Sequence, residues 1–291
     1  MNERPLTEGD LEAALALIVA DEERINGRPS RRTLGDIRAW TSRADLARDS
    51  WLFEDGEGIA AVGWVDVFGG LAVAVGIVHP RAKALGLGGR LVERAESHAA
   101  GRAERVQQFT IGEDSAAREL MLARGYRDVR HFFEMAIELD GPPEVNDVPI
   151  EAFREEDARV FHDAIEDAFR DHWEHHATPF EEWWDRHRQN PSFDPSLWFL
   201  IRDGDACAAI IRNEASRNGG GYVGVLGVRR PWRGRGYGRA LLLHTFREFY
   251  GRGITRVTLG VDAENPTGAT KLYEGVGMQV EEENVVYEKA L

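Results

Sequence analysis

Cysteine is nearly absent from this sequence, which excludes the class of proteins held together by disulfides. Cys207 is the only cysteine among 291 residues, so no disulfide framework can form within the chain. Because Cys207 lies in the apolar run 206–211, a small buried residue is favoured over a nucleophile. A single thiol is typical of a reducing compartment, and we expect a cytoplasmic protein.

Long apolar runs and an excess of positive charge are also missing. No run nears the roughly 18 apolar residues of a membrane-spanning helix, and the first residues lack the basic-then-apolar pattern of a secretion signal. We therefore expect no membrane association. Asp and Glu number 50 against 36 Lys and Arg, a net charge of −14, which argues against a nucleic-acid partner.

A turn rich in glycine and arginine is the most informative feature that the sequence does contain. The apolar strand 223–228 leads to Pro231, and the turn Arg233–Gly238 then opens an apolar helix. Glycine lets the backbone approach a ligand closely, and the first amides of a helix can bind an anion. This order indicates a diphosphate site, although the turn by itself fits a solvated loop equally well. Its spacing matches neither the dinucleotide fingerprint nor the P-loop.

Two motifs together resemble one known family. Arg233, Gly236 and Gly238 form an Arg-x-x-Gly-x-Gly pattern that resembles the acyl-CoA pyrophosphate loop of the GNAT superfamily of N-acyltransferases. The stretch 262–278 follows a strand and resembles that superfamily's other signature, with Asn, Ala, Leu-Tyr-Glu and Gly-Met in the same order. The resemblance implies acetyl-CoA as the acyl donor and a mixed, twisted α/β sheet flanked by helices.

The same pattern occurs twice, and Val228 follows its counterpart Val78 by 150 residues. A stretch rich in turn formers, 140–147, separates the copies. We therefore expect two tandem GNAT-type α/β domains, a non-catalytic one at 1–141 and a catalytic one at 147–291. The paired residues are Val78, Lys83, Gly86, Gly88 and Leu91 with Val228, Arg233, Gly236, Gly238 and Leu241, and, after a slip of two residues, Gly125 with Gly277.

The resemblance also implies catalytic roles. Tyr273 matches the tyrosine that protonates the leaving CoA thiolate, whereas Met121 in the first copy cannot donate a proton. A backbone amide, of Leu226 or Gly227, matches the oxyanion donor, and that strand is expected to splay from its neighbour and pair with the pantetheine arm. The resemblance places CoA against Leu226, Gly227, Val228, Arg233, Gly234, Arg235, Gly236, Tyr237, Gly238, Arg239, Asn265, Ala269 and Tyr273, and against Val78, Lys83, Gly86, Gly88 and Gly89 in the first copy.

The general base is not evident from the sequence. Many relatives carry Glu or Asp on the strand before the turn, but residues 222–225 here are Tyr-Val-Gly-Val. Asp262 and Glu264 are the nearest carboxylates, and a histidine group is the other source. That group has the spacing of one helix face, yet no fourth ligand is spaced to complete a metal site, so we expect no metal. Its members are His172, His175 and His176.

These features favour acetyl transfer from acetyl-CoA to a primary amine of a small molecule by direct attack, in a monomer or homodimer. The doubled domain resembles the mycothiol synthases, which implies a cysteinyl amine as one specific acceptor. The missing strand carboxylate and the altered first copy leave a non-catalytic acyl-CoA sensor or scaffold as the alternative. A mononucleotide-binding fold is a weaker alternative.

Overall fold

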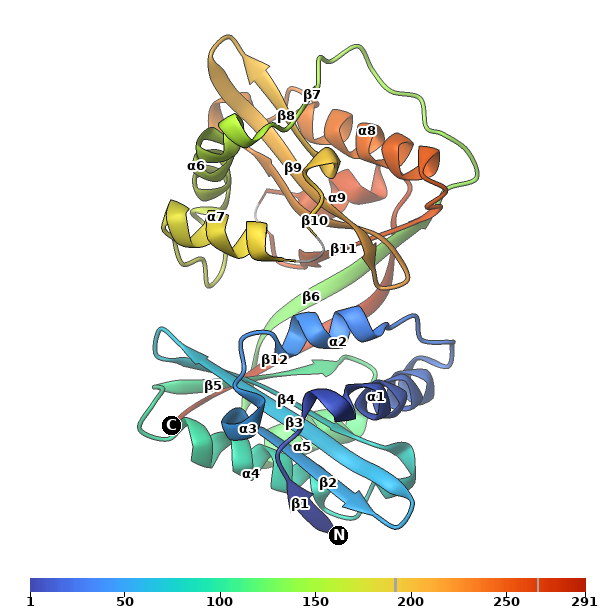
Figure 1. The fold of residues 1–291 in the computed structure, drawn as a ribbon, viewed down its shortest axis with the longest axis vertical. Coiled ribbons are helices and arrows are strands. Elements are labelled where there is room, and N and C mark those ends of the chain that lie inside the picture. The colour runs from blue at the N-terminus through green and yellow to red at the C-terminus, as the bar shows by residue number, and fades with distance from the viewer. Residues whose placement is uncertain (191–192, 266) are drawn as a thin grey trace. The chain divides into compact units, whose positions relative to one another are not determined.

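The computed structural model describes residues 1–190, 193–265 and 267–291, and the chain forms two compact units. Unit 1 comprises Met1–Phe133, Asp262–Glu264 and Glu282–Leu291, and unit 2 comprises Glu134–Val261 and Asn265–Glu281. Each unit contains a mixed sheet with helices on both faces, which confirms the expected fold class (Figure 1).

The sheet of unit 1 has the strand order β1-β2-β3-β4-β5-β12. Neighbouring strands pair antiparallel except β4 and β5, which run parallel. The sixth strand comes from the far end of the chain, because Asn284–Ala290 pair with Arg105–Ile111. The strands are β1 (Asn2–Arg4), β2 (Ser50–Asp55), β3 (Gly58–Phe68), β4 (Leu71–Val78), β5 (Arg105–Ile111) and β12 (Gln279–Ala290).

Helices cover both faces of this sheet. On one face α1 packs Leu17 and Ile18 against Leu52 and Trp64. On the other face α4 and α5 pack against apolar side chains that include Tyr287 of β12. The helices of unit 1 are α1 (Leu11–Asn26), α2 (Leu34–Thr41), α3 (Leu46–Asp49), α4 (Leu87–Ala99) and α5 (Ser115–Ala123), with the 3-10 helices η1 (Glu8–Asp10) and η2 (Pro80–Ala82).

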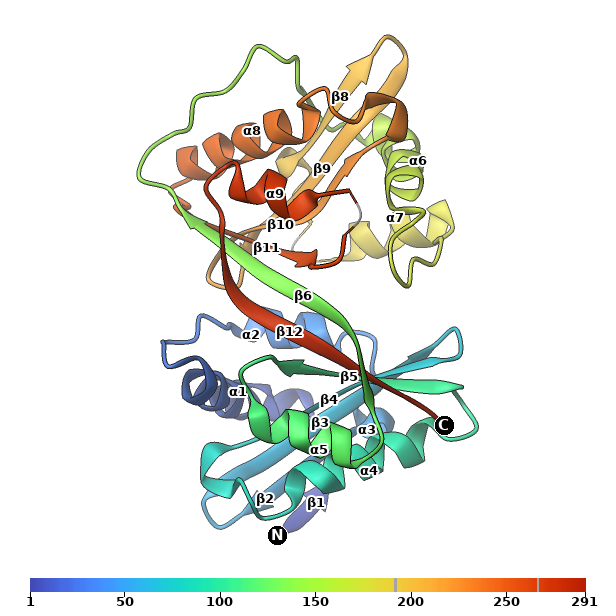
Figure 2. The ribbon, with the colours of Figure 1, turned by 180° about the vertical axis from the view of Figure 1, so that it is seen from behind.

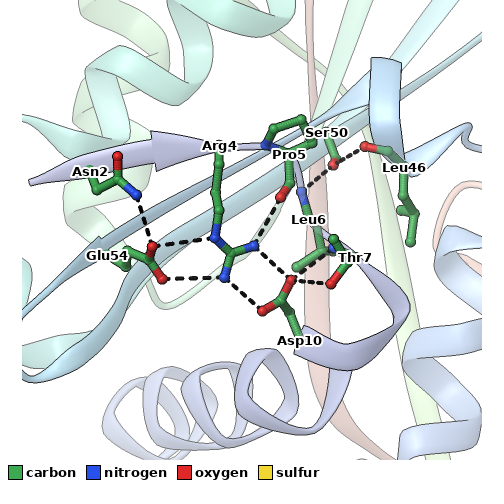
Figure 3. Close-up of polar contacts among 9 residues, drawn as sticks. All are labelled: Asn2, Arg4, Pro5, Leu6, Thr7, Asp10, Leu46, Ser50 and Glu54. Carbon is green, nitrogen blue, oxygen red and sulfur yellow. Dashed lines mark hydrogen bonds and ion pairs between the residues drawn. The ribbon is translucent and has the colours of Figure 1, made fainter.

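A charged network around Arg4 holds the short strand β1 in place (Figure 3). The Arg4 guanidinium donates to both carboxylate oxygens of Asp10, at 2.8 Å each, and to Glu54 at 3.2 and 3.3 Å. Asp10 also accepts from the Thr7 amide at 2.9 Å, so Thr7 and Asp10 form the capping box that their sequence spacing predicts. Hydrogen bonds from Arg4 hold the pKa of Asp10 far below its ordinary value.

Unit 2 repeats this plan with the strand order β6-β11-β10-β9-β8-β7. Strands β7 to β10 pair antiparallel, and β10 and β11 run parallel. After β6 the chain stays beside β11, because the Leu139 amide donates to the Thr255 carbonyl at 2.7 Å. The strands are β6 (Arg127–Glu138), β7 (Glu151–Ala152), β8 (Trp198–Asp203), β9 (Ala206–Arg217), β10 (Gly220–Val228) and β11 (Arg256–Asp262).

Helices α6 and α7 lie on one face of this sheet and α8 and α9 on the other, as the view from behind shows (Figure 2). Trp198 lies at the centre of an aromatic core beneath α6 and α7. The Phe161 ring stacks on it, with 5.3 Å between the ring centres. The α8 side is tightly packed, since a Cβ at Gly221 would lie 2.8 Å from the Phe249 ring. The helices are α6 (Ala158–Phe169), α7 (Phe180–Gln189), α8 (Tyr237–Gly251) and α9 (Ala269–Glu274), with η3 (Glu155–Asp157), η4 (Pro195–Leu197) and η5 (Arg230–Trp232).

Three expectations about local structure are wrong. The pattern of residues 34–47 predicts a single helix, but α2 ends at Thr41. A separate short helix begins after Asp45, which caps it by accepting from the Ala47 amide. Residues 170–179 form turns and extended chain rather than a helix, so the histidines there share no helix face. The last strand, β12, was not expected at all.

The assignment of β12 to the two units also bears on the expected domain ranges. Its residues Glu282–Ala290 belong to unit 1, while Glu134–Glu138 of β6 belong to unit 2. The ranges 1–141 and 147–291 therefore describe the two copies of the sequence repeat. That each range is a separable domain stays a prediction. No helix among the described residues combines the length and apolar character needed to span a bilayer.

Candidate active site

The strand β10 separates from β11 halfway along its length. The parallel pairing covers only Gly221–Val223, opposite Val257–Leu259. Pairing with β9 on the other side continues to Val228. The segment 224–228 therefore keeps one edge of its backbone outside the β10–β11 ladder, which confirms the expected splay.

A β-bulge in β10 begins at the point of separation. Val223 faces Asn213 while Val225 faces Arg212, so Gly224 is an extra residue in β10. The corresponding strand of unit 1, β4, pairs with β3 without any such shift. A bulge bends its strand and re-aims the residues that follow. The two copies therefore differ in backbone as well as in side chains.

The ladder with β9 decides which amides face the open edge of β10. The Arg229 amide donates to the Ala208 carbonyl at 3.0 Å, and antiparallel residues alternate between bonded and non-bonded pairs. Gly227 and Val225 consequently direct their amides at β9. Leu226 and Val228 direct theirs to the side from which β11 has turned away. Of the two residues expected to supply the oxyanion donor, Leu226 therefore has the suitable direction.

The turn after β10 has the backbone that its glycines require. Gly234 and Gly236 adopt φ values of 78° and 81°, in the left-handed region, and Gly236 is the N-cap residue of α8. Gly238 lies inside the helix, where a Cβ would come within 3.0 Å of the Leu272 side chain on α9. These glycines hold the first amides of α8, from Tyr237 on, beside α9 and at the end of the open edge.

The arginines of this turn do not all serve as free positive charges. Arg233 donates to the carbonyls of Val228 at 3.1 Å and Ala168 at 3.2 Å, so it ties the turn to the last residues of α6. Arg235 reaches Asp203 at 3.3 Å and stays half exposed. Arg239, on the first turn of α8, is exposed, and no polar partner of its side chain is found within the described part of the chain.

Tyr273 on α9 is buried, and burial together with the nearby Tyr222 raises its pKa to about 12. The hydroxyl therefore carries its proton at neutral pH. The preceding segment is shaped by Asn265, whose side-chain oxygen accepts from the Thr267 amide at 2.8 Å. Ala269 then begins α9, after a left-handed Gly268.

The expected base candidates are engaged elsewhere. The Asp262 carboxylate is buried and receives two bonds from Arg130, at 2.6 and 3.0 Å, and Glu264 receives a third at 3.1 Å. The three histidines have separate neighbours: His172 lies 3.4 Å from Asn265, His175 3.0 Å from Glu166, and His176 3.7 Å from Glu174. Among the described residues, no three His, Cys, Asp or Glu side chains are grouped so as to hold a metal ion.

Unit 1 keeps the strand, turn and helix start of this site, but the side chains around them differ. Ala84, at the place of Gly234, is forced into a left-handed φ of 65°. Lys83 forms ion pairs with Asp21 at 3.0 Å and Asp114 at 3.7 Å. Arg124 lies against the start of α4 and donates to the Gly89 carbonyl at 3.0 Å, and Met121 is buried in the core. Val78 ends β4, Gly86 is the N-cap residue of α4, and a Cβ at Gly88 would come within 3.2 Å of the Leu120 side chain.

Two charged residues beside the bulge were missed in the sequence. Arg212 and Glu214 lie on β9, opposite Val225 and Tyr222 respectively. Both side chains are about one fifth exposed, at 19% and 20%. The available signal was their position at the end of an apolar strand, where a charged side chain needs a partner or a function.

Comparisons with known proteins agree with this geometry. The Acetyltransferase (GNAT) family model matches residues 158–278. Mycothiol acetyltransferase of Thermobispora bispora is 31% identical over 297 residues, 97% of each chain. The same enzyme of Thermobifida fusca is 31% identical over 237 residues, 72% of each.

Solved structures extend this agreement to the fold of both copies. A GCN5-related N-acetyltransferase from Sphaerobacter thermophilus has 32% identity and a TM-score of 0.87, covering 99% of this chain and 95% of that one. A tandem GNAT protein from the clavulanic acid biosynthesis pathway, at 14% identity, shows the fold alone, with a TM-score of 0.74 over 99% of this chain and 98% of that one. The chain therefore belongs to the GNAT family of acetyltransferases.

Proposed function

We propose that unit 2 transfers an acetyl group from acetyl-CoA to a primary amine of a small molecule. The observation that carries the proposal is the open edge of β10, which ends at a glycine turn and a helix N-terminus. An extended pantetheine arm can pair with that edge as a strand would. The first amides of α8 then suit the diphosphate, with Arg239 free to add charge.

The reaction follows from the two groups at this edge. The amine nitrogen attacks the thioester carbonyl, and the Leu226 amide donates to the oxyanion that forms. The carbon–sulfur bond then breaks and Tyr273 gives its proton to the thiolate. The nitrogen of the new amide loses its extra proton to water, and Tyr273 regains a proton from solvent. With a pKa of about 12, Tyr273 is a weak acid. Burial also raises the pKa of the thiol that forms there, which favours proton transfer to the thiolate.

The amine must be neutral to attack. An alkyl amine has a pKa of about 10.4 and is mostly ammonium at pH 7. Because Asp262 and Glu264 are committed to Arg130, turnover should rise between pH 7 and 9 as the neutral fraction grows.

The relatives' name guides the first acceptor to test, a cysteinyl amine. Thioester consumption is measured with acetyl-CoA and a panel of amines that includes cysteinyl amides. Tyr273→Phe should lower kcat about 100-fold with little change in the KM for acetyl-CoA. Tyr250→Phe, on α8 of the same unit, is the matched control and should leave kcat unchanged.

The alternative of an acyl-CoA sensor predicts a different result. Saturable binding of CoA without turnover on any amine would contradict the transferase proposal. Equal rates in Tyr273→Phe and the parent enzyme would remove Tyr273 from the mechanism.

A further inference from the structure

Arg212 is a largely buried cation, with 19% of its side chain exposed, and its protein neighbours satisfy it poorly. The Nε atom is buried and has no hydrogen-bond partner among the described residues. Arg212 forms an ion pair with Glu214, whose carboxylate oxygen lies 3.6 Å from Nη1, beyond a normal hydrogen bond. Since a guanidinium has five donors, and a buried donor without a partner is unfavourable, this arrangement favours an anionic partner.

The surroundings of Arg212 suit a planar anion. Its guanidinium carbon lies 5.8 Å from the centre of the Trp198 ring. A Cβ at Gly224 would come within 3.2 Å of Nη2, so the glycine at the bulge gives the guanidinium its room. Burial lowers the pKa of Arg212, but arginine stays charged at any ordinary pH.

This cation lies close to the reacting edge of unit 2. Gly224 belongs to the bulge, and Leu226 follows two residues later, at about 7 Å along an extended strand. A short carbon chain could therefore join an anion bound to Arg212 to an amine placed at the thioester carbonyl.

We propose that Arg212 binds a carboxylate or equivalent oxyanion of the acceptor, so that the acceptor is an amino-acid-like amine. The inference rests on the proposed function of unit 2 and names its substrate class. Planar bidentate recognition of a carboxylate is the contact for which arginine is suited. Glu214, 3.6 Å from Arg212 and 3.9 Å from Arg217, supplies the negative charge that favours the ammonium of the incoming zwitterion.

The test compares amines that differ only in the anion. Cysteine and cysteinamide form one pair and glycine and glycinamide another, with the N-acetyl product measured by mass spectrometry. Arg212→Met should lower kcat/KM for the carboxylates 10- to 100-fold and change it less than 3-fold for the amides. Comparing variants on the same amine cancels the different basicities of the amines. Arg188→Met, an exposed arginine of α7, is the matched control and should change neither.

A binding measurement keeps this inference separate from the proposed function. In the full chain, the ¹⁵Nε–¹H resonance that disappears in Arg212→Lys should shift saturably with acetate. The same titration with inorganic phosphate tells a carboxylate from a phosphate as the preferred anion. Turnover without any effect of Arg212→Met on the carboxylate pairs, or no saturable shift with either anion, overturns the inference. Absence of turnover on every amine contradicts only the transferase function, and the titration then decides for Arg212.

Discussion

Ala84 and Gly234 occupy equivalent places in the two turns and adopt nearly the same backbone, with φ values of 65° and 78°. A left-handed conformation costs an L-residue about 1–2 kcal/mol, whereas glycine adopts it freely. Unit 1 thus retains the turn geometry of a ligand site although its sequence no longer favours it. The strain at Ala84 is stored in the fold of that unit.

Ala84→Gly should therefore stabilise the protein, by about 1 kcal/mol after the larger unfolded-state entropy of glycine is subtracted. The matched substitution Gly234→Ala should destabilise it by a similar amount, since nothing lies within 4 Å of a Cβ there and backbone strain is its main cost. Urea denaturation of both variants measures these changes. A destabilising Ala84→Gly would show that the left-handed backbone at Ala84 is not strained.

At the scale of single residues, the sequence predicted the turn that Gly234 and Gly236 form but not the partners of the charged side chains. A motif fixes backbone conformation through glycine, because few other residues adopt a positive φ. The ion pairs of Lys83 and Asp262, and the hydrogen bond from Arg233 to the Ala168 carbonyl, depend on elements distant in sequence. For the same reason the sequence showed only that Arg212 ends an apolar run, and its unpartnered Nε is a property of the packed sheet.

Among the elements, β1 depends most on charge. Its three residues bury little apolar surface, and the Arg4 side chain is 35% exposed. Arg4→Met should cost about 1 kcal/mol, the value of a well-aligned but partly exposed ion pair. Arg127→Met, at the exposed first residue of β6, is the control and should change stability little.

The same pair predicts a dependence on pH. Because Arg4 holds the pKa of Asp10 below its ordinary value of 3.8, the stabilisation is complete above about pH 5 and is lost as the pH falls through the folded-state pKa. The stability of the parent protein should therefore decline below pH 4 more steeply than that of Arg4→Met. Thermal unfolding between pH 2.5 and 6 measures both slopes, and parallel curves would contradict the coupling.

Element prediction succeeded where periodicity and caps were strong and failed where composition misled. The apolar spacing predicts helices over 115–123 and 158–169, and α5 and α6 form over these residues. Strand β12, QVEEENVVYEKA, carries glutamates on a strand of which Val285, Val286 and Tyr287 are buried. Single-sequence reasoning discounts such a strand, because its burial depends on pairing with β5.

For the whole molecule, β12 decides where the chain can be cut into separately folding parts, because most of this last strand belongs to unit 1. Val285, Val286 and Tyr287 are buried in unit 1. Three such side chains contribute roughly 1.5–3 kcal/mol each, comparable with the 5–15 kcal/mol that stabilises a typical domain. The sequence repeat at 1–141 thus lacks a strand that its unit requires.

A chain truncated after Glu281 should accordingly lose the cooperative unfolding of unit 1. Fragment 1–141 should be unstable alone but should fold when residues 282–291 are joined to it through a flexible linker. Hydrogen exchange of the β5 amides reports both results. Full protection of β5 in the truncated chain would contradict this account of the strand.

The central claim is that the turn after β10 in unit 2 binds acyl-CoA, and calorimetric titration of the full chain with acetyl-CoA tests it most directly. Gly236→Val forces a β-branched residue into a φ of 81°, while Gly253→Val makes the same change at a φ of 76° beyond the end of α8. We expect saturable binding of acetyl-CoA to the parent chain. Gly236→Val should weaken this binding at least 10-fold, and Gly253→Val should leave it intact, in equally folded proteins. Binding that is absent from the parent chain, or that survives in Gly236→Val, would contradict it.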